Sequence, residues 1–136
     1  MLQRIQSIWL LLASVCAFLT LKLPTFSGTT PDGIPSSELM GMPNFLLTVL
    51  TVIIGVLALI TIFLYGNRKL QFRLCLLGLI LEIGLIVLYY LEIKKYLLGT
   101  YALTSIFHVG VILFFFLAAR SITNDDKIIR ESNRLR

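Results

Sequence analysis

Residues 72–91, FRLCLLGLILEIGLIVLYYL, are almost wholly apolar and carry a single acid, Glu82, near their centre. A helix that crosses the hydrocarbon core of a bilayer, ~30 Å thick, needs about 20 such residues. The stretch has that length, and it has too few polar side chains to form the solvent-facing side of a helix in a water-soluble domain. It therefore predicts a transmembrane helix.

Three further stretches, residues 5–23, 44–65 and 101–119, have the same character. The chain of 136 residues is 57% hydrophobic and 14% charged, whereas soluble domains carry about 25% charged residues. The predicted fold class is therefore all-α: an integral membrane antiparallel four-helix bundle that forms one domain over residues 1–136. A cleaved signal peptide, or a lipoprotein signal ending at Cys16, fits residues 5–23 less well, because no cleavage motif follows and Val15 is not small.

Lys and Arg residues are distributed unevenly between the two sides of the predicted bundle. Nine of the 12 lie in the N-terminus, in or beside the link at residues 66–71 and in the tail at residues 120–136; the other three are Lys22, Lys94 and Lys95. Cytoplasmic segments of membrane proteins carry the excess of positive charge. Both termini are therefore predicted to be cytoplasmic, and the net charge of +5 reflects this bias rather than nucleic-acid binding.

The connections between the spans contain turn-forming residues. Residues 24–43 are interpreted as a connector with a turn at residues 31–33, although they could also cap the bundle or touch a partner. In the short link at residues 92–100, Gly99 is expected to end a helical turn or to act as a hinge. The tail predicts a separate short amphipathic helix capped by Thr123 or Asn124. That helix could lie on the inner leaflet, dock on a soluble partner or fold back on residues 66–71.

Glu82 and His108 are the most informative polar residues inside the spans. Acids within a membrane usually face the bundle interior, and the antiparallel arrangement puts His108 within about one helical turn of the depth of Glu82. A contact between them has two interpretations: a proton-responsive or ion-binding pair, or a buried hydrogen bond that fixes helix packing. The second is favoured, because a proton path needs more polar residues than the spans contain.

Small residues in the spans recur at steps of three and four, which is typical of helix–helix contacts in lipid. In residues 44–65 they predict one buried stripe, made of Thr48, Thr51, Gly55, Ala58, Ile62 and Tyr65. The sequence contains no nucleophile–base set, phosphate loop or Cys/His cluster. We therefore expect no catalytic, cofactor-binding or metal-binding residues, and a protein that is not an enzyme.

Three segments resemble one family. They are MLQRIQSIWLLLA at residues 1–13, NRKLQFRLC at residues 67–75 and NDDKIIRESNRLR at residues 124–136. Together they resemble the bacterial family called domain of unknown function 4293, which consists of small four-pass membrane proteins. The closing segment departs from the family pattern at Asn133, where members carry an acid. The resemblance implies a four-pass protein of the bacterial inner membrane and carries no known activity.

The three segments all fall on the predicted cytoplasmic side and are rich in charge. Arg4 or Arg73 could meet Asp125 or Asp126 if the tail folds under the bundle, and the alternative is a docking surface for another protein. The candidate cytoplasmic interaction surface consists of Arg4, Arg68, Lys69, Arg73, Asp125, Asp126, Arg130, Arg134 and Arg136.

These observations favour a non-enzymatic inner-membrane protein, a subunit or an accessory or assembly factor of a larger membrane complex. Its expected partners are the lipid bilayer and other membrane proteins, and not nucleic acid. The alternative is a small proton-coupled transporter that works as a homo-oligomer and uses Glu82 and His108. An enzyme acting on lipids or thiols has the least support.

Overall fold

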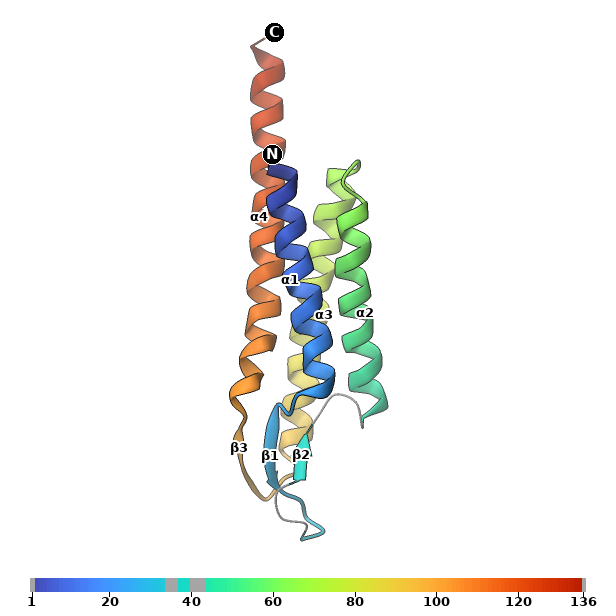
Figure 1. Cartoon of the computed structure of the whole chain (residues 1–136), viewed down its shortest axis with the longest axis vertical. Coiled ribbons are helices and arrows are strands. Elements are labelled where there is room, and N and C mark those ends of the chain that lie inside the picture. Colours follow the sequence, from blue (N-terminus) through green and yellow to red (C-terminus); the bar gives the residue numbers. More distant parts are fainter. Residues whose placement is uncertain (1, 34–36, 40–43, 136) are drawn as a thin grey trace.

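The structure is a computed structural model that describes residues 2–33, 37–39 and 44–135 (Figure 1). It contains four helices, which are α1 (Leu2–Lys22), α2 (Phe45–Phe63), α3 (Arg68–Ile93) and α4 (Ile106–Arg134). A short 3₁₀ turn, η1 (Leu103–Ser105), precedes α4. All four helices are long and apolar enough to cross a membrane. The predicted all-α four-helix bundle is confirmed, and the chain is a multi-pass membrane protein.

The four helices form a ring. Helix α1 packs against α2 and α4, and α3 packs against the same two neighbours. Both chain termini and the α2–α3 turn lie at one end of the bundle, which we call the terminal end (Figure 1). The other end, which we call the sheet end, carries three short strands. The polar and charged features of the molecule divide between these two ends.

Small residues on the inner faces of the helices allow this close packing. A Cβ atom added at Gly55 would lie 2.7 Å from the Phe18 ring, and one added at Gly78 would lie 2.7 Å from the Phe115 ring. Of the stripe predicted for the second span, Thr51, Gly55 and Ala58 are buried. The inclusion of Tyr65 is wrong, because its side chain is 62% exposed and lies beyond the end of α2.

The outward faces of the bundle are covered by large apolar side chains. Ile80, Val109 and Phe116 are each more than half exposed, and only about a third of each candidate span is buried inside the molecule. In water, so much exposed apolar surface would drive aggregation. In hydrocarbon it is already solvated, so packing of the inner faces is the main source of association between the helices.

Three antiparallel strands close the sheet end in the order β2-β1-β3. They are β1 (Phe26–Thr29), β2 (Ser37–Leu39) and β3 (Leu98–Tyr101). Gly28 pairs with Gly99 across the two strands, and a side chain at either would collide with the facing backbone. The expectation that Gly99 ends a helix or hinges it is therefore wrong. The turn at residues 31–33 is confirmed, with Gly33 at φ +77°.

The tail is part of α4 and does not form a helix of its own. Thr123, predicted as a cap, lies inside α4 and donates to the Arg120 carbonyl at 2.8 Å. The segment between the span and the tail contains no glycine or proline, so nothing in it interrupts the helix. As Figure 1 shows, the last turns of α4 continue past the other helices instead of folding back on residues 66–71.

Candidate functional site

Glu82 lies on the buried face of α3. Buried residues recur along this helix at steps of three and four, at Gln71, Cys75, Gly78, Glu82, Leu85 and Tyr89. The period is that of an α-helix, so one stripe faces the bundle interior over the whole length of α3. The Glu82 side chain is therefore 1% exposed and is directed away from the lipid.

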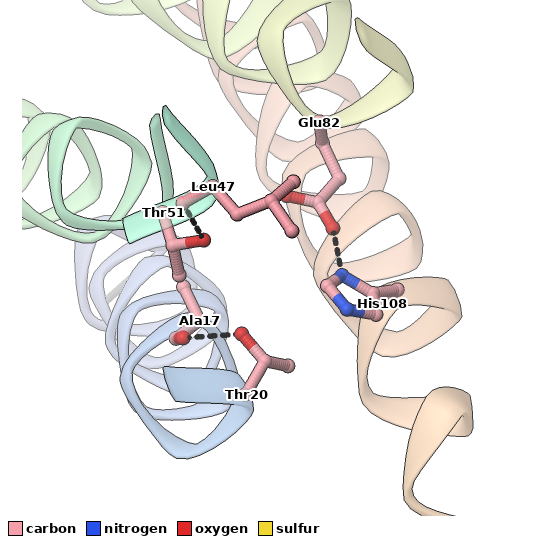
Figure 2. A network of polar contacts seen from close by, with 6 residues as sticks. All are labelled: Ala17, Thr20, Leu47, Thr51, Glu82 and His108. Carbon is pink, nitrogen blue, oxygen red and sulfur yellow. Dashed lines mark hydrogen bonds and ion pairs between the residues drawn. The ribbon is translucent and has the colours of Figure 1, made fainter. Parts of the chain in front are cut away.

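His108 approaches Glu82 from the first turn of α4. Its Nδ1 atom lies 2.8 Å from Oε1 of Glu82, and the structure thus brings the two residues together (Figure 2). His108 is buried, with a relative exposure of 5%. The ring of Tyr89, about two helical turns beyond Glu82 on α3, packs against the imidazole with a centroid distance of 4.8 Å. The Tyr89 ring thereby supports the orientation of the imidazole.

The hydrogen positions in this pair follow from its burial. A net charge is expensive in a low-dielectric interior, so the electrically neutral arrangements are favoured. In one of them, a carboxylate faces an imidazolium; in another, a carboxylic acid donates to Nδ1 of a neutral imidazole. In these two arrangements Nε2 of His108 carries a hydrogen. That atom is buried and has no hydrogen-bond partner among the described residues.

The hydroxyl groups nearest to the pair in Figure 2 are engaged within their own helices. Thr20 donates to the Ala17 carbonyl at 2.6 Å, and Thr51 donates to the Leu47 carbonyl at 2.7 Å. These bonds occupy the hydroxyl hydrogens of Thr20 and Thr51. The arrangement of Glu82 and His108 can hold or share a proton locally.

A second layer of buried polar groups lies at the terminal end. The amide of Gln6 donates to the carboxylate of Asp125, and the amide of Gln71 donates to the Thr61 carbonyl at 3.2 Å. Each of the four helices contributes one of these groups. Asp125 was predicted on the cytoplasmic surface, and this is wrong because it is 3% exposed. The sequence does contain a signal for this buried polar layer. Gln6 and Gln71 each fall on the buried stripe of their own helix.

The remaining charged candidates lie around this layer. Asp126 pairs with Arg130 at 3.0 Å along α4, and Asp125 contacts Gln6, so the tail makes these contacts without folding under the bundle. The side chain of Arg4, like Arg136, lies outside the described residues. Arg68 is half-buried, whereas the exposed side chains are those of Lys69, Arg73, Arg130 and Arg134.

A groove runs between the start of α3 and the projecting part of α4. It has a volume of about 260 Å³. Phe72 and Ile122 supply its apolar surface, and its charged lining residues include Arg68, Lys69, Lys127 and Arg130. Several of the predicted interaction residues are thereby gathered on one side of the molecule, between α3 and α4.

Metal-ligating residues are dispersed. In the ranges that the structure describes, no three His, Cys, Asp or Glu side chains come together. Cys16 and Cys75 are both free thiols, and each occupies a position on a packed helix.

The family of the chain follows from a comparison with known proteins. The family model described as "Domain of unknown function (DUF4293)" matches residues 2–135. No curated protein and no solved structure matches the chain. The match includes the polar layer at the terminal end and the pair formed by Glu82 and His108. The chain therefore belongs to the domain of unknown function 4293 family.

Proposed function

We propose that the protein is a non-enzymatic subunit, or an accessory or assembly factor, of a larger complex in the bacterial inner membrane. The observation that carries this proposal is the projection of α4 beyond the bundle. Every residue from 127 to 135 is exposed, which at about 1.5 Å per residue corresponds to a helical arm of about 14 Å. We call residues 127–135 the α4 arm.

The α4 arm leaves apolar side chains exposed. Ile128 is 51% exposed and Leu135 is 90% exposed. Contact with a partner would bury these side chains and stabilise the helix. The arm therefore has the features of a docking element.

The charge distribution supports a cytoplasmic terminal end. Arg68, Lys69 and Arg73 lie at the start of α3, and Lys127, Arg130 and Arg134 lie on α4. The sheet end carries only Lys22, Lys94 and Lys95 among the described residues. An excess of Lys and Arg at one end of the bundle is typical of the cytoplasmic side of a membrane protein, and both termini lie at that end.

The chemistry of the groove beside the arm indicates the kind of partner. Its charged lining is net basic, because four Lys and Arg residues outnumber the single acid, Asp126, which pairs with Arg130. These charges surround apolar surface from Phe72 and Ile122. An acidic amphipathic segment on the cytoplasmic side of another membrane protein would be complementary to both features.

Affinity purification in mild detergent tests this proposal. We expect the wild-type chain to recover a stoichiometric membrane-protein partner, and Lys127→Glu/Arg130→Glu to lose it. The matched control is Lys94→Glu/Lys95→Glu, which makes the same charge change on exposed residues at the sheet end and should retain the partner. Recovery of the wild-type chain alone, or loss of the partner in the control only, would contradict the proposal.

A second candidate function rests on the 2.8 Å contact between Glu82 and His108. A small proton-coupled transporter that works as a homo-oligomer would use this pair to bind and release a proton. Proteoliposomes containing the wild-type chain would then show proton-coupled flux, and Glu82→Gln would abolish it. Glu92→Gln, at the surface of the sheet end, is the control. Equal flux in wild-type and Glu82→Gln liposomes would exclude this function.

A further inference from the structure

A cavity of about 200 Å³ lies between α3 and α4 at the sheet end. Ile86, Tyr89 and Tyr90 line it from α3, Tyr101 from β3, and His108 and Val109 from α4. Tyr90, Tyr101 and Val109 are each more than half exposed on the outside of the bundle. The cavity therefore opens toward the side of the molecule that faces lipid, and a ligand would enter it from the bilayer.

His108 is one of three buried polar residues in the cavity lining, with Thr25 and Tyr89. Its Nδ1 atom is occupied by Glu82, and its Nε2 atom has no partner among the described residues. In the two neutral arrangements of the pair described above, Nε2 carries a hydrogen and the ring can donate one further hydrogen bond. A donor buried without an acceptor is costly, so a ligand that brings an acceptor oxygen would be stabilised here.

The size and lining of the cavity restrict the ligand further. An apolar cavity of about 150 Å³ holds one benzene molecule, so this cavity has room for a single substituted ring. Aromatic side chains from Tyr89, Tyr90 and Tyr101 favour a flat apolar ligand that can stack on them. The ligand is thus a ring that carries an acceptor oxygen and reaches the site through the membrane.

We propose that this cavity binds the headgroup of a lipid-soluble quinone, with one carbonyl oxygen accepting from Nε2 of His108. The isoprenoid or alkyl tail would leave past Val109 into the lipid. Glu82 holds the imidazole in place and is a positioning residue. This site is separate from the α4 arm, so it goes beyond the docking function and can fail or succeed independently of it.

Photolabelling tests the site directly. The probe is a short-chain azidobenzoquinone, photolysed with the purified full chain in phosphatidylcholine nanodiscs and mapped by mass spectrometry. We expect saturable labelling within residues 86–90 and 105–109, which unlabelled decyl-benzoquinone displaces. Val109→Phe, which fills the mouth of the cavity, should reduce labelling at least tenfold. Leu113→Phe, one turn further along the lipid-facing side of α4, is the matched control and should leave labelling unchanged.

A second variant tests the role of His108. Glu82→Leu/His108→Phe removes both polar groups, so no charge is left unpaired, and should also reduce labelling at least tenfold while the chain stays folded. Labelling that is undiminished in this variant and in Val109→Phe would overturn the proposal. A phospholipid that stays bound to the chain throughout a quinone titration, seen by native mass spectrometry, would overturn it in favour of lipid as the occupant.

Discussion

The two ends of the bundle each bury a carboxyl group, but they give it different partners. Near the sheet end, Glu82 contacts the imidazole of His108, which can itself gain or lose a proton. At the terminal end, Asp125 accepts from the amide of Gln6, which cannot. A carboxyl group beside a second titratable group can share a proton, whereas one beside an amide can only accept hydrogen bonds. The pair near the sheet end can therefore share a proton, whereas the contact at the terminal end can only fix the packing of its helices.

The largest expected effect tests the pair near the sheet end. His108→Phe leaves Glu82 buried without its partner, which costs about 1–3 kcal/mol for a neutral group and about 3–5 kcal/mol for a charge. We expect a loss of up to about 5 kcal/mol, measured by unfolding in mixed micelles. Glu82→Leu/His108→Phe should be more stable than His108→Phe, because it removes both polar groups. Additive losses in the double variant would show that the two side chains are not coupled.

A smaller effect is expected at the terminal end. Asp125→Ala leaves the buried Gln6 amide without an acceptor, and we expect a loss of about 1–3 kcal/mol in the same unfolding assay. Asp125→Asn keeps an acceptor oxygen for the Gln6 amide and should therefore lose less stability than Asp125→Ala. If Asp125→Asn were as damaging as Asp125→Ala, the charge of Asp125 would matter and the contrast between the ends would fail.

The region between the two ends can be tested at Gly78 of α3, which faces the ring of Phe115 on α4. Gly78→Ala places a Cβ atom 2.7 Å from the Phe115 ring, and such overpacking costs about 1–3 kcal/mol. Gly84→Ala is the control on the same helix, with no atom within 4 Å of the added Cβ. It should stabilise the chain by up to about 1 kcal/mol through helix propensity. Thermal unfolding in detergent would measure both, and equal effects would contradict the packing described.

The smallest effect is expected at the base of the α4 arm. Asp126 and Arg130 form an ion pair with side chains that are 44% and 70% exposed, and exposed pairs contribute about 0–1 kcal/mol. Asp126→Asn should therefore change the unfolding free energy by less than about 0.5 kcal/mol at physiological salt. A larger change would mean that the arm packs more tightly than its exposure indicates.

The sequence predicts the helical part of the fold well. Apolar length alone locates four spans, and the period of small residues places Thr51, Gly55 and Ala58 on an inner face, where the structure has them. The rule that acids within a membrane face the bundle interior places Glu82 there too. Antiparallel neighbours bring Glu82 and His108 to a similar depth. These features depend on local composition and on helical geometry, both of which are visible in one sequence.

The strands and the end of α4 are harder to predict. Strands β1 and β3 have four residues each and lie far apart in the chain, so neither has a periodic signal and their pairing depends on the helices that bring them together. The tail was interpreted as a separate helix because Thr123 and Asn124 resemble caps. Without a glycine or proline, tertiary packing of Ile122 and Asp125 continued the helix instead.

The unbroken course of α4 has a mechanical consequence. Its 29 residues make a stiff rod of about 44 Å, with His108 near one extremity and the free tip near the other. Sideways force on the tip is converted into tilt of the entire rod. A protein that held the tip would therefore shift the spacing between His108 and Glu82 without touching either of them.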